Sequence, residues 1–298
     1  MGRSLRNIDL AIIIFVITVW GGNFIAMKMG AMEIPPFFLL GMRLLIASLA
    51  LVWFIKSPRG MLFPLIGISF TMCILHFGLA LVGLKHVGAG VGALGMQAAV
   101  PFAALLAWLF YRESFGWLRV LGVIVAFFGL KIIYGIPSLA EHTEFFLLMI
   151  ISSLCFAIAT IQIKNLNTKD FLSINAWVSI FGTPMAFLVS AIAEDQQLQS
   201  LNSAEASVFL SILYMGLVAS VFGQGLWYRM LPIYKTNQLM PFTLLVPIIG
   251  LALGVLILDE VLTWQLVLGG MITVTGVAII IREPKKKIIW PINVSNKE

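Results

Sequence analysis

Ten apolar stretches run along this sequence of 298 residues, each about as long as a helix that crosses a bilayer. Such a helix needs roughly 20 residues, and lipid offers no water to exposed backbone groups. The stretches are continuously apolar and do not alternate, which argues against a β-barrel. We therefore predict an all-α integral membrane protein with ten transmembrane helices. The predicted spans are Ile8–Met27, Pro35–Ile55, Met61–Leu84, Val87–Tyr111, Phe115–Ile133, Phe145–Ile163, Phe171–Ala193, Ala206–Tyr228, Gln238–Leu258 and Leu262–Ile281.

The composition agrees with lipid as the solvent of this chain. Hydrophobic residues make up 60% of the sequence and charged residues only 11%, whereas a globular domain is about half apolar and about a quarter charged. The first span is not followed by a cleavage site and a soluble domain, so we expect it to remain as a helix. Cys73 and Cys155 both fall in apolar runs, which predicts neither a disulfide framework nor a metal site.

Basic residues are distributed unequally between the two ends of the predicted helices. Of the 19 Lys and Arg residues, only Lys28, Lys85 and Lys131 lie on one side, and Arg43 lies inside a span. The other basic residues lie on the opposite side, and short positively charged loops stay in the cytoplasm. We therefore predict a bacterial-type inner-membrane protein with both termini cytoplasmic. The net charge of +6 then reports membrane orientation and contact with lipid headgroups, and we expect no nucleic acid as a partner.

The two halves of the sequence resemble each other. The stretch from Glu113 aligns on the stretch from Glu260, and Phe77-Gly78 matches Phe222-Gly223 with a drift of one residue. We predict two five-helix repeats, 1–135 and 144–282, followed by a basic cytoplasmic tail, 283–298. The coinciding positions of the first stretch are Glu113, Trp117, Val120, Leu121, Gly122, Gly129, Ile132 and Ile133, and those of the second are Glu260, Trp264, Val267, Leu268, Gly269, Gly276, Ile279 and Ile280.

A repeat of five helices has consequences for function. Because five is odd, the second copy enters the membrane in the opposite direction and forms an inverted pair with the first. Two inverted halves can build one central site that opens alternately to either side, which favours solute transport. The alternative is that the duplication only builds a stable bundle. No GxxxxGK[ST] motif is present, so ATP is not expected as the direct energy source, and we expect no cofactor.

Several motifs resemble the drug/metabolite transporter superfamily, and specifically its EamA-type exporters, over nearly the whole chain. They are Trp20-Gly21-Gly22-Asn23-Phe24 with Lys28, Pro35-Pro36 with Arg43, Gln97 sixteen residues before Glu113, Pro241–Gly250, and Leu258-Asp259-Glu260 before Leu262-Thr263. Within this family the chain is similar to the bacterial O-acetylserine/cysteine exporters. The resemblance implies export of amino acids or related metabolites. Efflux of drugs or other metabolites by the same fold is the alternative.

Polar residues at the depth of the bilayer are candidates for a substrate pathway, since they usually face the interior of a bundle. Trp20 and Asn23 share one helix face, where Asn23 can bond a substrate or link two helices. Arg43 lies deep in its span, and its forked donors suit a carboxylate or a structural tie. Gln97 sits four residues before Pro101, which frees a backbone carbonyl in that turn.

The remaining candidates lie on two further stripes. Gln224 and Trp227 follow Ser220 at helical spacing and form a polar and aromatic stripe. His76 has the same spacing from Ser69 and Cys73, and an imidazole can titrate near neutral pH. It is therefore the most plausible group for proton coupling, with a hydrogen-bonded structural role as the alternative. Facilitated diffusion is the alternative to coupling.

A membrane enzyme or a structural partner protein is the competing class of function. The three histidines, His76, His86 and His142, fall in different segments, and neither an HExxH nor a GxSxG motif is present. The sequence therefore predicts a transporter and not an enzyme. Its expected partners are a small-molecule solute and membrane lipids, with protons as an open alternative, and the oligomeric state stays undetermined at this point.

Overall fold

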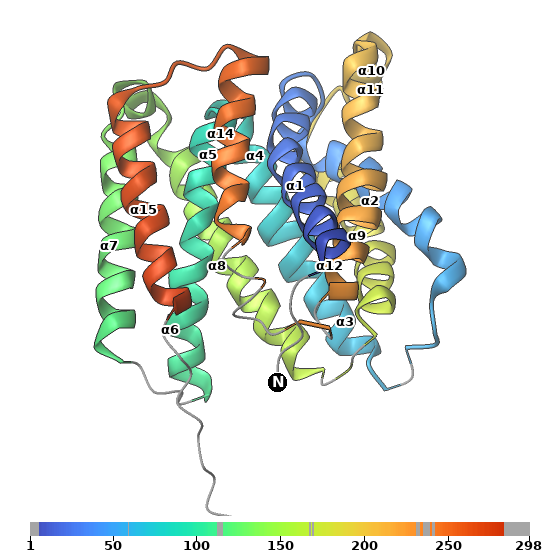
Figure 1. Ribbon diagram of the computed structural model, residues 1–298. Coiled ribbons are helices and arrows are strands. Elements are labelled where there is room, and N and C mark those ends of the chain that lie inside the picture. The colour runs from blue at the N-terminus through green and yellow to red at the C-terminus, as the bar shows by residue number, and fades with distance from the viewer. Residues whose placement is uncertain are drawn as a thin grey trace, which may run out of the picture.

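The computed structural model of the chain is an all-helical bundle (Figure 1). It describes residues 6–58, 60–111, 116–166, 168, 170–230, 233–234, 239 and 242–282. Among these residues, nine helical stretches are long and apolar enough to cross a membrane, so the chain is a multi-pass membrane protein. They are Asn7–Glu33, Pro36–Phe54, Leu62–His86, Ala89–Phe110, Trp117–Tyr134, Leu139–Asn165, Phe171–Ala193, Ala206–Trp227 and Trp264–Ile281.

The helices follow the chain as the sequence predicts, with breaks inside some spans. Those of the first half are α1 (Asn7–Glu33), α2 (Pro36–Leu51), α3 (Leu62–Ser69), α4 (Leu79–His86), α5 (Ala89–Gly95), α6 (Ala99–Tyr111) and α7 (Trp117–Tyr134). Those of the second half are α8 (Thr143–Asn165), α9 (Phe171–Ala193), α10 (Gln197–Ser203), α11 (Ala206–Leu213), α12 (Gln224–Met230), α14 (Leu245–Leu258) and α15 (Trp264–Arg282).

The predicted span Gln238–Leu258 is the one that differs. The structure has α14 over Leu245–Leu258, a helix of 14 residues, which is shorter than the roughly 20 residues that cross the hydrocarbon core. Gln238 and residues 240–241 lie outside the described part of the chain. Asp259 ends α14 in a left-handed conformation, with φ of 52°. The count of ten spans therefore stays a prediction.

Two π-helical segments interrupt long helices at corresponding places in the two halves. The segment Phe70–Gly78 joins α3 to α4, and the segment Tyr214–Gly223 joins α11 to α12. Both end at a Phe-Gly pair that the sequence repeat had already matched. A π-turn takes one residue more per hydrogen bond than an α-turn, and such turns are frequent at functional sites. The two halves therefore share an irregularity of the backbone as well as a sequence pattern.

Carboxylates link the two halves at the end of the bundle that lies opposite the N-terminus (Figure 1). Glu194, after α9, accepts hydrogen bonds of 2.8 and 3.0 Å from the first backbone N–H groups of α2. Glu260, after α14, accepts the N–H groups of Ala89 and Gly90 at the start of α5. Glu33, at the end of α1, accepts the N–H of Glu205 before α11. A carboxylate at a helix N-terminus satisfies free donors and complements the helix dipole.

The helices α7 and α15 lie side by side at one edge of the bundle (Figure 1). A Cβ atom placed on Gly122 would lie 2.9 Å from the carbonyl oxygen of Gly276, and one on Gly129 would lie 2.6 Å from that of Gly269. The contact residues advance along α7 while they retreat along α15, so the two helices are antiparallel. Glycines let helix backbones approach closely within a membrane, and these four belong to the sequence repeat.

We predict that Gly129→Ala destabilises the protein by about 1–3 kcal/mol, the usual cost of overpacking. The added methyl group would lie 2.5 Å from the backbone nitrogen of Thr273, so α7 and α15 must move apart. The measurement is the thermal unfolding midpoint of the detergent-purified protein. Gly67→Ala is the matched control, because nothing lies within 4 Å of that position. Equal midpoints for the two variants would contradict the close packing.

Candidate functional site

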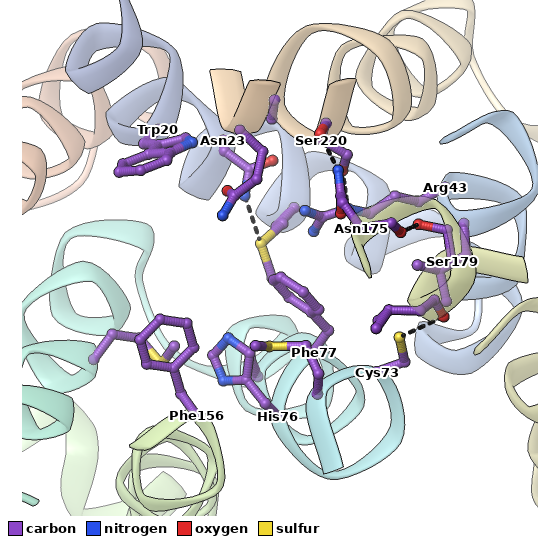
Figure 2. Close-up of a pocket in the computed structure, with 18 of the residues that line it drawn as sticks. Trp20, Asn23, Arg43, Cys73, His76, Phe77, Phe156, Asn175, Ser179 and Ser220 are labelled. Carbon is purple, nitrogen blue, oxygen red and sulfur yellow. Dashed lines mark hydrogen bonds between the residues drawn. The ribbon is translucent and has the colours of Figure 1, made fainter. Parts of the chain in front are cut away.

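A cavity of about 270 Å³ lies in the centre of the bundle (Figure 2). Its walls come from α1, α2 and the π-helical segment Phe70–Gly78 of the first half, and from α8, α9 and the segment Tyr214–Gly223 of the second. The cavity reaches Ile163 in the last turn of α8 and Ile174 in the first turn of α9. It therefore extends from the middle of the bundle towards the end at which α8 and α9 are connected.

Most of the residues that the sequence nominates lie on this cavity. Trp20, Asn23, Arg43, His76 and Gln224 line it. The remaining two, Gln97 and Trp227, are not among its lining residues. Gln97 follows Met96, which does line the cavity. Trp227 is buried, and its ring centroid lies 5.2 Å from that of Trp20 in a tilted aromatic pair. The structure thus gathers five of the candidates around one space, and Trp227 packs against one of them, Trp20.

Arg43 is the central charged group of the cavity and is 4% exposed. Its Nε donates a hydrogen bond of 3.2 Å to the hydroxyl oxygen of Ser220, in the other half of the chain. Its guanidinium carbon lies 4.3 Å from the centre of the Phe77 ring, which is a cation–π contact. The buried Nη1 atom has no hydrogen-bond partner among the described residues. The guanidinium is therefore held in place while part of its donor capacity stays unused.

Asn23 offers an acceptor in the same cavity. Its Nδ2 donates to the sulfur of Met27 at 3.2 Å, within α1. Its Oδ1 is buried and has no partner in the described part of the protein. An unsatisfied buried polar atom costs about 1–3 kcal/mol, so these two atoms have hydrogen-bonding capacity left for a polar molecule in the cavity.

His76 lies on the π-helical segment of the first half, between the rings of Phe77 and Phe156. Its Nδ1 lies 3.1 Å from the backbone carbonyl oxygen of Ser152 and 3.0 Å from the Ser152 hydroxyl oxygen. The Ser152 hydroxyl donates in turn to the backbone carbonyl of His76 at 2.8 Å. This reciprocal pair fixes the imidazole against α8, with its ring towards the cavity (Figure 2).

Sequence reasoning missed two polar residues of the cavity. Asn175 and Ser179 stand one turn apart on α9 and line the cavity. The Asn175 Nδ2 donates a hydrogen bond of 2.9 Å to the backbone carbonyl of Ser220 in the second π-helical segment. Asn175 could have been found as an amide at the depth of the bilayer, by the same argument that selected Asn23. The aromatic walls Phe77 and Phe156 carry no such signal, since phenylalanine is common throughout this sequence.

The cavity has an electrostatic character that follows from these residues. Among the described residues that line it, Arg43 is the charged one and none carries a carboxylate. Within the part of the chain that the structure describes, no group of three or more His, Cys, Asp or Glu side chains is placed to hold a metal ion. The rest of the lining is largely apolar and includes several aromatic and methionine side chains. The arrangement suits binding of a small solute and offers no assembled catalytic group.

Comparison with known proteins agrees with this arrangement. The model of the EamA-like transporter family matches residues 7–135 and again residues 145–282. A protein of Escherichia coli (strain K12) named "Probable amino-acid metabolite efflux pump" is 27% identical over 280 residues, which cover 91% of this chain and 94% of that protein. An uncharacterized transporter of Bacillus subtilis (strain 168) is 26% identical, over 89% of this chain and 94% of its own length.

A solved crystal structure has the same fold. It aligns with a TM-score of 0.64 and 14% sequence identity, and the alignment covers 93% of this chain and 98% of that one. At this identity the likeness concerns the fold alone.

We predict that Asn175→Ala lowers stability by about 1 kcal/mol or somewhat more, a usual cost for losing a side-chain hydrogen bond between membrane helices. The substitution leaves the carbonyl of Ser220 without the donor that Asn175 supplies. Thr160→Ala is the control, because Thr160 is exposed and its hydroxyl bonds only within its own helix. The measurement is the thermal midpoint in detergent, and an unchanged midpoint for Asn175→Ala would contradict the role of this bond.

Proposed function

The chain belongs to the EamA-like transporter family, and we propose that it exports amino acids or related small metabolites across a bacterial-type inner membrane by alternating access. The family is one of transporters and not of enzymes. The observation that carries the proposal is the cavity that both halves of the chain build around Arg43. Relatives named as probable amino-acid metabolite efflux pumps supply the proposed direction and class of substrate.

We propose that the repeats 1–135 and 144–282 form an inverted pair. The antiparallel contact between α7 and α15 supports this, because both helices stand at the same place in their repeats. Equivalent helices that run antiparallel are related by an axis perpendicular to them, and such an axis lies in the membrane plane. The corresponding π-helical segments, Phe70–Gly78 and Tyr214–Gly223, support it as well. Ten spans are part of this proposal.

The geometry also suggests which end of the cavity is closed. The cavity reaches towards the connection between α8 and α9. Lys164 lies in the last turn of α8, and the Nζ of Lys56 lies 3.7 Å from the Oδ2 of Asp170 at the start of α9. With cytoplasmic termini, this is the cytoplasmic end. At the opposite end, Glu33, Glu194 and Glu260 bond backbone groups of the other half. In this mechanism those three contacts must part before the cavity can open outwards.

The size of the cavity is compatible with a small metabolite. This cavity measures about 270 Å³, close to the lower end of the roughly 300–1,000 Å³ that is usual for pockets of drug-sized ligands. A space of this size favours a single small metabolite such as O-acetylserine or cysteine. Coupling to protons through His76 and facilitated diffusion are the two modes of transport that fit a site without ATP.

We expect saturable counterflow when the purified protein is reconstituted in liposomes loaded with O-acetylserine, cysteine or other amino acids. Met72→Trp should lower the initial rate severalfold or more, because Met72 lines the cavity and an indole would fill it. Met271→Trp is the matched control, since Met271 is 57% exposed on the outer surface of the bundle. Absence of saturable flux for every solute in the panel would refute the proposed function.

The orientation can be tested with single cysteines in a variant that lacks Cys73 and Cys155. Ser57 and Gln199 are exposed at opposite ends of the bundle. With cytoplasmic termini, a membrane-impermeant maleimide should label Gln199→Cys in intact spheroplasts and label Ser57→Cys only after the membrane is permeabilised. The reverse pattern would place the termini outside.

A further inference from the structure

The cavity contains hydrogen-bonding capacity of both kinds that the described part of the protein does not use. Arg43 Nη1 is a buried donor without a partner, and Asn23 Oδ1 is a buried acceptor without one. Both side chains line the cavity and point into it (Figure 2). Leaving such groups unpaired in a bilayer interior is costly. A ligand that accepts at one position and donates at the other would remove both costs.

His76 supplies a second acceptor. A carbonyl oxygen can only accept a hydrogen bond, so the contact of 3.1 Å between His76 Nδ1 and the Ser152 carbonyl places the proton on Nδ1. In the neutral ring, Nε2 then carries a lone pair and no proton. The ring of His76 packs 4.5 Å from that of Phe77, against which the guanidinium of Arg43 also packs. The donor cation and this acceptor therefore lie against one phenyl ring.

The contacts of Arg43 fix the orientation of its guanidinium group. Ser220 accepts from Nε and is itself fixed by donating 2.7 Å to the carbonyl of Met215. The Phe77 ring supports the guanidinium plane at 4.3 Å. A guanidinium fork bonds a carboxylate through two parallel N–H groups. A lysine ammonium at the same position would lose both this fork and the bond from Nε.

The positive charge of the cavity restricts which solutes can bind there. Arg43 brings one positive charge, and no lining residue in the described part of the chain carries a carboxylate. A cationic solute would therefore add a second positive charge in a low-dielectric space, which is unfavourable. A solute with a carboxylate neutralises the guanidinium, and its ammonium group finds the acceptors. The apolar remainder of the lining, such as Met72, Phe156 and Ile174, suits an uncharged side chain.

We propose that the cavity selects zwitterionic α-amino acids with uncharged, mainly apolar side chains. The substrate carboxylate bonds Arg43, the ammonium group bonds Asn23 Oδ1 and His76 Nε2, and the side chain packs among the apolar residues. This rests on the proposed function and adds to it the part of the substrate that is recognised. It assigns Arg43 as the residue that determines selection for the carboxylate, and Asn23 with His76 as the residues that determine selection for the amine.

The test uses the purified full-length protein in liposomes and counterflow of labelled L-leucine. Two analogues keep the leucine side chain and lack one charged group each: 3-methylbutylamine lacks the carboxylate, and 4-methylpentanoate lacks the amine. Each lost charged hydrogen bond is worth about 1.5–3 kcal/mol, so each analogue should compete about tenfold to a hundredfold more weakly than leucine. L-lysine and L-glutamate should compete weakly as well, because their side chains bring an extra charge.

Substitutions test which residues cause the difference in competition between leucine and its analogues. Arg43→Gln should weaken competition by leucine about tenfold to a hundredfold and remove its advantage over 3-methylbutylamine. Asn23→Asp should reduce the discrimination against L-lysine, since it introduces a carboxylate into the cavity. Lys131→Gln is the control, because Lys131 is exposed on α7, which does not line the cavity. Elution as a single species on size exclusion shows that each variant is folded.

The outcomes distinguish failure of this inference from failure of the proposed function. Equal competition by leucine and 3-methylbutylamine in the unaltered protein would overturn this inference. So would an undiminished preference for leucine in folded Arg43→Gln. Flux of cations or uncharged metabolites without flux of amino acids would overturn it and leave transport intact. Absence of flux for every solute would overturn the proposed function itself, and this inference with it.

Discussion

Hydrocarbon offers no hydrogen-bonding partner to a helix that departs from regular α geometry, and this constraint decides where the cavity can be. Both π-helical segments leave backbone carbonyls in need of donors, and polar side chains from neighbouring helices supply them. Ser152 on α8 bonds the carbonyl of His76, and Asn175 on α9 bonds that of Ser220. The side chains that repair the backbone are thus next to the ones that face the cavity. The irregular backbone and the polar cavity therefore occur together, because polar side chains near the cavity bond the carbonyls of the π-helical segments.

The two halves of the chain depend on each other for the cavity and for the ends of their helices. Arg43 belongs to the first half, whereas the hydroxyl that orients it belongs to Ser220 in the second. The same exchange occurs at the end of the bundle, where Glu194 and Glu260 bond the starts of α2 and α5. Neither half therefore contains a complete site or a complete set of capped helices. A relative movement of the halves must change the cavity and these end contacts together.

The sequence predicts much of the fold, because the length and continuity of apolar stretches reflect the thickness of a bilayer directly. It also nominates Asn23, Arg43 and His76, since polar groups in apolar runs are rare enough to be noticed. It does not predict the π-helical segments, because a π-turn changes the backbone pairing without a distinctive composition. It therefore gives no reason to expect that the carbonyl of Ser220 needs the donor that Asn175 supplies. It also wrongly places Gln97 and Trp227 on the cavity, because helical spacing alone does not show which face of a helix lines a cavity.

The contact between α7 and α15 has the symmetry of a homodimer although it lies within one chain. Gly122 meets Gly276 and Gly129 meets Gly269, and the repeat exchanges these two pairs. In an isologous interface the same surface patch is used on both sides, so each residue position occurs twice in the contact. A five-helix polypeptide with this surface could form the same contact with a second copy of itself, provided that the two copies were inserted in opposite directions. Fusion of two such copies fixes one pair of orientations, and afterwards each glycine is free to change independently of its equivalent.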